Sequence, residues 1–281
     1  MIGIPLWGQA QGGAVEAPDA ASIMARMVVN VAAAEPARRS YVYHQTVRAS
    51  LSKTNGKPVR KERREYDVLP GEERTEKKLA EFEGERYEGR ETELYFEPDK
   101  GEGLDAELIR SMTQELVDDH RSRDGIPHNL FPLTERDLPH YTFTLLERGD
   151  FRGRPVYKIA FDPLLKDLCV KESGHEEECD SPWKGEIWVD TEDLQPARIV
   201  TDLGAKIPWG VRVFLGTNVK QLGFAVSYRR VEPGVWFPVS YGTEFRLDLL
   251  WFYKRNITLS LESKDFRRAD ATSSIEFDLA Q

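Results

Sequence analysis

The run SYVYHQTVRASL, residues 40–51, decides the fold. Apolar and polar side chains alternate along it, and the apolar members are Tyr41, Tyr43, Val47, Ala49 and Leu51. This period of two is typical of a strand with one buried face and one exposed face. The pair Asn55-Gly56 then favours a tight turn, and VRKERREYDV (59–68) follows as a second strand. The sequence therefore predicts an antiparallel hairpin.

The same alternation recurs along the rest of the chain. It is found in YTFTLL (141–146), VYKIAF (156–161), GEIWVD (185–190), LGFAVSY (222–228) and NITLSLES (256–263). No helical pattern separates these runs from one another. Consecutive strands without intervening helices favour an antiparallel meander, and they exclude a doubly wound parallel sheet.

Two segments have the apolar period of a helix. The first is predicted to begin at Asp19, a good N-cap, and to end at Glu35 because Pro36 follows. The second is predicted from about Asp105 to a point before Gly125. Their apolar sides carry Ile23, Met24, Met27, Val28 and Val31 in the first and Leu108, Ile109, Met112, Leu116 and Val117 in the second. We expect both helices to lie over one face of the sheet.

The charged run from Lys53 to Arg64 spans the predicted hairpin turn. Such runs usually form a solvated sheet edge that discourages aggregation, and we expect that role here. Over the whole chain 48 acidic residues face 39 basic ones, for a net charge of -9. A negative protein repels phosphate backbones on average, so a nucleic-acid partner is not expected.

The first residues, MIGIPLWGQA, combine a short apolar run with small residues but have no basic start. We interpret residues 1–18 as the remnant of a secretory signal or a disordered lead-in, and residues 19–281 as a single domain. No other apolar run approaches the roughly 18 residues needed to span a membrane. The sequence therefore predicts an exported protein without a transmembrane segment.

Both cysteines lie in one short stretch, CVKESGHEEEC (169–179). Three interpretations stay open: a disulfide between Cys169 and Cys179, a zinc site that adds His175, or two unpaired thiols. The spacing lacks the close C-x-x-C pair of structural zinc sites, whereas a disulfide over a loop of this size would stabilise an exported protein by roughly 2.7 kcal/mol. Export therefore favours the disulfide, and no bound metal is expected.

Catalytic motifs are missing from the sequence. Ser240 lacks the first glycine of a nucleophile elbow, no phosphate-binding loop stands between a strand and a helix, and the histidines have no paired spacing. We therefore expect a protein that is not an enzyme and that uses no cofactor.

Two later runs carry a family resemblance. WKGEIWVDTEDLQPARIV (183–200), followed by GVWFPVSYGTEF (234–245), resembles the bacterial outer-membrane lipoprotein-sorting superfamily, which includes LolA-, LolB- and RseB-like carriers. Its members share a G-x-x-W-[IV]-D strand and turn, then a strand with a proline-flanked apolar pair. The resemblance implies an α+β fold, in which a strongly curved antiparallel half-barrel is covered on its concave face by a few helices over an apolar cavity for acyl chains.

The apolar sides of the alternating strands and of the two helices suggest which residues would line that cavity. They are Met27, Met112, Phe143, Leu145, Ile159, Phe161, Ile187, Val189, Phe224 and Val226. Each of them fits an ordinary packed core equally well. The favoured function is a periplasmic carrier for lipid or lipoprotein acyl chains. Two alternatives stay open: an envelope sensor or interaction module with a membrane-protein partner, and a metal-assisted enzyme using Cys169, His175 and Cys179.

Overall fold

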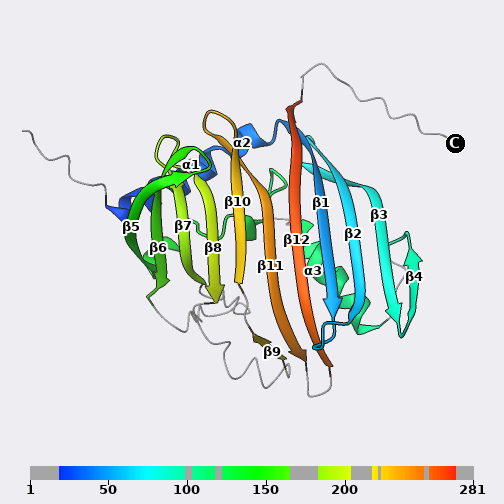
Figure 1. Cartoon of the computed structure of the whole chain (residues 1–281). Coiled ribbons are helices and arrows are strands. Elements are labelled where there is room, and N and C mark those ends of the chain that lie inside the picture. Colours follow the sequence, from blue (N-terminus) through cyan, green and yellow to red (C-terminus); the bar gives the residue numbers. More distant parts are fainter. Residues whose placement is uncertain are drawn as a thin grey trace, which may run out of the picture.

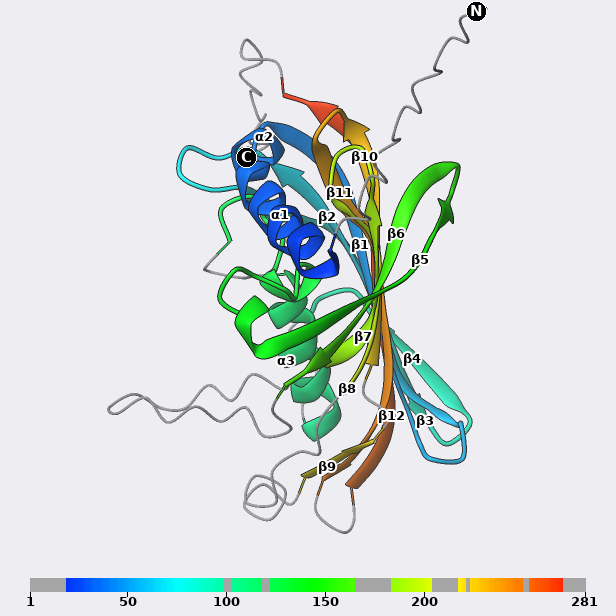
Figure 2. The same cartoon turned by 90° about the vertical axis from the view of Figure 1, so that its left-hand side faces the viewer.

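The protein has an α+β fold with one open antiparallel sheet, seen in a computed structural model (Figure 1). The structure describes residues 19–98, 103–117, 122–164, 183–203, 217–220, 223–249 and 253–269. The helices lie on one face of the sheet, which we call the helix-covered face (Figure 2). The predicted fold class, a curved antiparallel sheet with helices over one side, is confirmed. Among the described residues, no helix is long and apolar enough to cross a membrane.

The described elements follow in chain order. The helices are α1 (Ala20–Ala33), α2 (Glu35–Arg38) and α3 (Leu104–Val117), with short 3-10 turns at His128–Leu130 and Leu138–His140. The strands are β1 (Tyr41–Ser52), β2 (Pro58–Leu69), β3 (Glu76–Glu88), β4 (Glu91–Tyr95), β5 (Tyr141–Phe151), β6 (Arg154–Pro163), β7 (Trp183–Asp190), β8 (Pro196–Leu203), β9 (Thr217–Lys220), β10 (Gly223–Glu232), β11 (Val235–Leu249) and β12 (Tyr253–Arg268).

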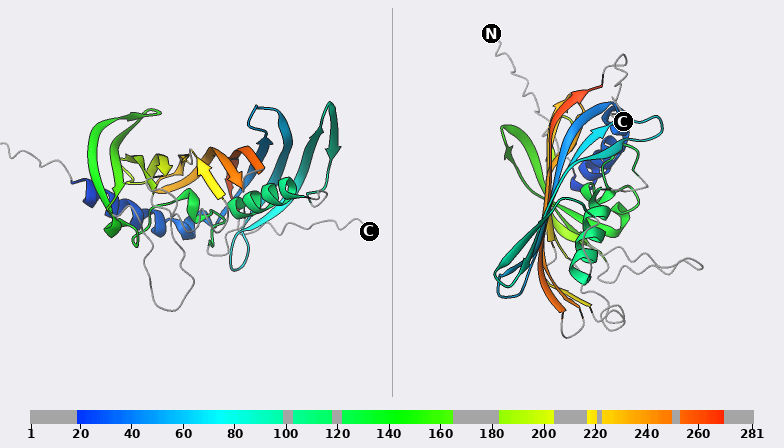
Figure 3. Two further views of the ribbon diagram at one scale, coloured as in Figure 1. Left: turned by 90° about the horizontal axis from the view of Figure 1, so that it is seen from below. Right: turned by 90° about the vertical axis from the view of Figure 1, so that its right-hand side faces the viewer.

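The strand order shows two meanders joined by the last strand. The order is β4-β3-β2-β1-β12-β11-β10-β8-β7-β6-β5, and β9 pairs with β11 beside this path. β12 therefore lies between β1 and β11, in the middle of the sheet. The sheet is strongly twisted, so that in side view the outer strands of its two ends cross like the arms of an X (Figures 2 and 3).

The helices begin where the sequence predicts, but the first one ends differently. Asp19 caps α1, and its side chain accepts a hydrogen bond from the Ser22 backbone N–H at 3.2 Å. Pro36 does not simply end a helix, because it lies in the first turn of α2, where its missing N–H removes no helical hydrogen bond. The second predicted helix is α3, which the structure describes from Leu104 to Val117.

The hairpin predicted from residues 40–68 is confirmed. The Lys53 backbone N–H bonds to the Lys57 carbonyl at 2.8 Å, and Gly56 has a φ of 82°, which glycine adopts without strain. The apolar residues of β1 face the helices, and Val47, Ala49 and Leu51 are each at most 3% exposed. They join a continuous core that also includes the buried side of α1.

The charged strand β2 is not the solvated edge that we expected. It lies between β1 and β3, and every second residue points to the helix-covered face. Arg60, Glu62 and Arg64 are 3%, 4% and 7% exposed. Only the alternate residues, such as Lys61, lie toward solvent. The expectation was wrong because it treated the run as one surface, whereas a strand divides it between two faces.

Candidate functional site: the helix-covered face of the sheet

One half of the helix-covered face is apolar, and the structure places the predicted strand residues together there. Phe143 lies opposite Phe161, Leu145 opposite Ile159, and Ile159 opposite Ile187. Ile159, Phe161, Ile187, Val189 and Val226 are fully buried, Phe224 is nearly so, and Met27 of α1 belongs to the same core cluster. We call this half, built by β5 to β8 and β10, the apolar end.

The apolar end is not covered evenly. Its row of apolar side chains, which runs across the strands, continues to the edge strand β5. There Tyr141, Phe143 and Leu145 are only half-buried. Met112 is not part of the apolar end: it lies on α3, which packs on β1 and β2, and there it is half-buried against the core. The structure therefore places these residues at the margin of the core, whereas the central residues are buried within it. Whether any of them contacts a ligand stays a prediction.

The other half of the same face, which we call the charged end, carries a buried group of charges. Glu62 accepts hydrogen bonds from Arg60 Nε at 3.0 Å, Arg64 Nη2 at 2.7 Å and the Tyr95 hydroxyl at 2.8 Å. The Arg60 guanidinium also lies over the Tyr95 ring, 4.6 Å from its centre. We call these four residues the Glu62 cluster. One carboxylate thus holds two arginines and one tyrosine of β2 and β4 in place.

Two local features support the Glu62 cluster. Gly84 lies beside Tyr95, and a Cβ atom there would be 2.1 Å from the tyrosine ring, so only glycine leaves room for it. Burial, together with the hydrogen bond to Glu62 and its charge, raises the pKa of Tyr95. The hydroxyl therefore stays protonated at neutral pH and donates to the carboxylate.

A second ion pair fixes α3 over this end of the sheet. Asp105, in the first turn of α3, accepts from Arg255 Nε at 2.7 Å, from Arg255 Nη2 at 2.9 Å and from the Tyr253 hydroxyl at 2.6 Å. Burial alone would raise the pKa of Asp105, but these hydrogen bonds and the nearby positive charges lower it below its usual value. Both partners belong to β12, so this contact joins the helix to the centre of the sheet.

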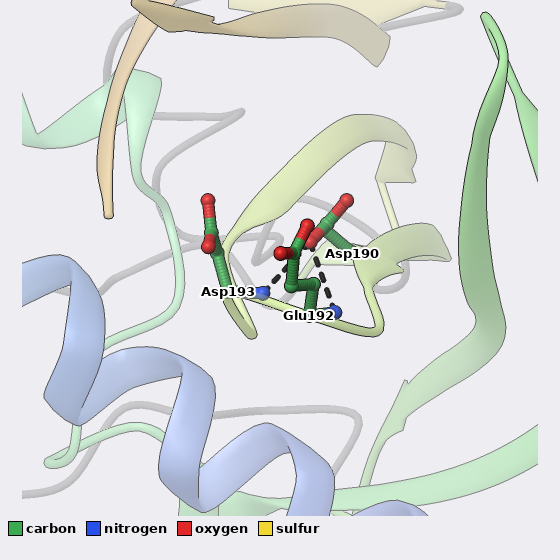
Figure 4. A group of neighbouring side chains, drawn as sticks. All are labelled: Asp190, Glu192 and Asp193. Atoms are coloured by element: carbon green, nitrogen blue, oxygen red, sulfur yellow. Dashed lines mark hydrogen bonds between the residues drawn. The ribbon is translucent and has the colours of Figure 1, made fainter. Parts of the chain in front are cut away.

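The turn between β7 and β8 brings three carboxylates close together (Figure 4). Oxygens of Asp190, Glu192 and Asp193 lie within 4.8 Å of one another, a spacing that could hold a metal ion. Arg154 Nε, however, lies 2.6 Å from Asp190, and Arg154 Nη2 lies 2.8 Å from Glu192. Arg230 Nη2 lies 3.1 Å from Asp193. Because each of the three carboxylates already pairs with Arg154 or Arg230, the arrangement is that of a stabilised turn.

This turn also holds α1 on the sheet. Asp190 accepts from the backbone N–H groups of Glu192 and Asp193 at 3.1 and 2.8 Å, which closes the turn. Asn30 of α1 donates to the Asp193 carbonyl at 3.0 Å, and Gln195 donates to the Asn30 carbonyl at 2.8 Å. The aspartate of the W-V-D motif therefore has a positioning role in this chain.

Burial alone would raise the pKa of Asp190. The hydrogen bonds from Arg154 and from the backbone of Asp193 and Glu192 outweigh this effect, and the pKa is lowered below its usual value. The carboxylate is therefore ionised at neutral pH, as the turn requires.

A cavity of about 480 Å³ lies between the start of β3 and the last residue of α3. Its lining is largely polar, and it comprises Arg74, Thr75, Glu76, Lys77, Val117, Ser122 and Gly125. None of the ten residues predicted to bind an apolar ligand lines it. This cavity therefore does not correspond to the predicted acyl-chain site.

The cysteine loop lies outside the described residues, as do residues 1–18. The disulfide between Cys169 and Cys179, the metal alternative with His175, and the signal remnant all stay predictions.

No described protein family and no curated protein matches this sequence. Among solved structures, the chain is similar to a putative outer membrane lipoprotein-sorting protein domain from Vibrio parahaemolyticus, with 11% identity, a TM-score of 0.35, and coverage of 90% of this chain and 97% of that one. A LolA superfamily protein from Nitrosomonas europaea has 12% identity and a TM-score of 0.31, with coverage of 90% of this chain and 95% of that one. The matching chain of the MucA/MucB complex of Pseudomonas aeruginosa has 11% identity and a TM-score of 0.25, with coverage of 90% of this chain and 100% of that one. The first two names are those of the superfamily that residues 183–200 resemble.

Proposed function

We propose that the chain is a non-catalytic carrier of the bacterial periplasm that binds acyl chains or another apolar cargo on the apolar end of its helix-covered face. The observation that carries this proposal is the continuity of the apolar row. It runs from fully buried residues such as Ile159 to half-buried ones such as Phe143 and Leu145 at the sheet edge. An acyl chain that lies along this row would extend an apolar surface that already exists.

The cover over the apolar end suits such a ligand. α1 presents Met24 and Met27 to the sheet. Met112 is not part of this cover, because α3 packs on β1 and β2. Methionine side chains are unbranched and flexible, so they adapt to ligands of variable shape, although they also fill gaps in ordinary cores. The envelope location is supported by the apolar N-terminal run and by the motif resemblance of residues 183–200.

Binding of a fluorescent fatty-acid probe tests the proposal. We expect saturable binding to the full chain, and Leu145→Gln should weaken it about fivefold because it puts a polar amide on the half-buried row. The matched control is Leu94→Gln on β4, where the leucine is 54% exposed, and its binding should equal that of the unchanged chain. Val226 is unsuitable for this test, since a bulky residue at a fully buried position would disturb the core itself.

A failure of this test has a clear meaning. If the probe shows no saturable binding, or if the two leucine variants weaken it equally, the carrier proposal is wrong and an envelope interaction module of the same fold becomes the better assignment. Tightly bound metal in the purified protein, lost on Cys169→Ser, would instead support the metal-assisted enzyme.

A further inference from the structure

The two edges of the sheet differ in length and charge. β4 is a strand of 5 residues that carries Glu91 and Glu93. β5 has 11 residues, and among the described strands none pairs with it on the side away from β6. Figure 2 faces this edge, and β5 crosses the front of the molecule there. The β5 backbone therefore offers a row of hydrogen-bonding groups to another strand.

In the part of the chain that the structure describes, the first half of β5, YTFTLL (141–146), lacks the usual protection of an edge strand. It has no charged residue and no proline over six positions. Thr142, Thr144 and Leu146 are exposed, and the alternate residues are half-buried on the apolar end. Natural proteins normally shorten, charge or cover such an edge because it pairs readily with other chains. An edge of this kind indicates a pairing surface.

We propose that a second copy of this chain pairs with the edge, so that two β5 strands run antiparallel about a twofold axis. With the axis at Phe143, Tyr141 of one copy lies opposite Leu145 of the other, and Thr142 lies opposite Thr144. Residues directly opposite in an antiparallel pair point to the same face. The half-buried apolar row then continues across the contact into its own counterpart, and the threonines pair on the outer face.

The charges of the chain agree with this register. A net charge of -9 opposes random association of two copies, but the paired segment itself is neutral. In the register centred on Phe143, Glu147 of one copy reaches Pro139 of the other, where the missing N–H ends the ladder. The charged second half of each β5 therefore lies beyond the contact. Pairing between two copies therefore involves only the uncharged first half of each β5 strand.

Sedimentation of the full chain tests this proposal, which does not depend on the proposed function. We expect a dimer, and Thr142→Lys/Thr144→Lys should weaken it about tenfold or more because two lysine pairs then lie directly opposite each other. Thr142→Glu/Thr144→Glu should weaken it similarly. A mixture of the two variants should restore the dimer, since each lysine then faces a glutamate. Thr92→Lys/Leu94→Lys, on the other edge strand, is the matched control and should stay dimeric.

Three results would overturn the proposal. The first is an unchanged chain that stays monomeric at about 100 µM, a concentration at which even weak specific pairs associate. The second is a lysine variant as dimeric as its β4 control. The third is a lysine–glutamate mixture that does not re-associate, which would leave this edge to an extended strand of another protein. Probe binding by the monomeric lysine variant separates this outcome from a failure of the carrier proposal.

Discussion

The two ends of the helix-covered face are equally buried, but one consists of apolar side chains and the other of charged ones. In the apolar end Ile187 is 0% exposed, and in the charged end Glu62 is 4% exposed. Both lie on the same face of one sheet. The difference teaches that a sheet can bury a strongly charged strand when one carboxylate lies between two arginines and accepts hydrogen bonds from both. On β2 the sequence Arg-x-Glu-x-Arg places alternate charges side by side on one face.

The two ends also distribute their stabilising contacts differently. In the apolar end many side chains each contribute a share through burial, and no single one is indispensable. In the charged end one carboxylate accepts hydrogen bonds from Arg60, Arg64 and Tyr95. Removing that carboxylate leaves two arginines uncompensated in a dry environment, which is the costly case for buried charges.

The largest effect is therefore expected for Glu62→Gln. The free energy of unfolding should fall by about 3–5 kcal/mol, the usual loss when one partner of a buried ion pair is removed. Urea unfolding of the purified chain measures it. Glu83→Gln on the neighbouring strand is the control, since Glu83 is exposed, and its stability should change by less than about 0.5 kcal/mol. Equal values for the two variants would show that the cluster is hydrated.

Replacing the whole group sharpens the same comparison. In Arg60→Met/Glu62→Leu/Arg64→Met the charged end becomes apolar like the other end, and such replacements are often neutral or stabilising. We expect this variant to be more stable than Glu62→Gln. A triple variant less stable than the single one would mean that the cluster contributes more than charge neutralisation.

A somewhat smaller effect is expected in the apolar end for Ile187→Ala. Truncating this fully buried side chain leaves a cavity, so the free energy of unfolding should fall by about 3 kcal/mol. Val29→Ala on α1, where the valine is 49% exposed, should cost less than about 0.5 kcal/mol. If a fatty-acid ligand restores part of the stability lost in Ile187→Ala, the cavity is accessible to cargo. Thermal unfolding with and without the ligand measures this.

The smallest effect concerns pH and the turn that joins α1 to the apolar end. Because the folded-state pKa of Asp190 is lowered, its contribution to stability is complete above the unfolded-state value of about 4 and is lost as pH falls through the folded-state pKa. Asp190→Asn removes this contribution, so its urea midpoint should vary less than that of the unchanged chain between about pH 5 and pH 2. Parallel pH curves for the two proteins would contradict the role given to Asp190.

Alternation and turn chemistry predicted most of the fold. The period of two placed β1, β2, β5, β6, β7, β10 and β12, Asn55-Gly56 placed the hairpin, and Asp19 placed the first helix, because each of these signals is local. The period of two did not identify β3, β4, β8 or β9. The position of β12 between β1 and β11 could not be predicted, since pairing between distant strands has no signature in either strand alone. The sequence also identified the apolar row but not what covers it, because a helix and an acyl chain can each bury the same apolar side chains.

The Glu62 cluster was missed although the sequence contained a signal for it. In the hairpin, Leu51 lies opposite Arg60, Ala49 opposite Glu62 and Val47 opposite Arg64. Carrying the buried face of β1 across the turn would have put these charges inside. The composition of the run argued against it, because charged residues are rarely buried unless they are paired, and pairing partners are visible only in three dimensions.

The central place of β12 has a consequence for how the chain reaches this fold. Strands β1 to β4 can form a meander from contacts close in sequence, and so can β5 to β8. The contact between Arg48 and Glu262, however, joins residues 214 positions apart. Closing so long a loop is entropically costly and slow, so we expect insertion of β12 to be the late, rate-limiting step of folding. Until then β1 keeps an unpaired edge in the middle of the future sheet, where a chaperone or another nascent chain can bind.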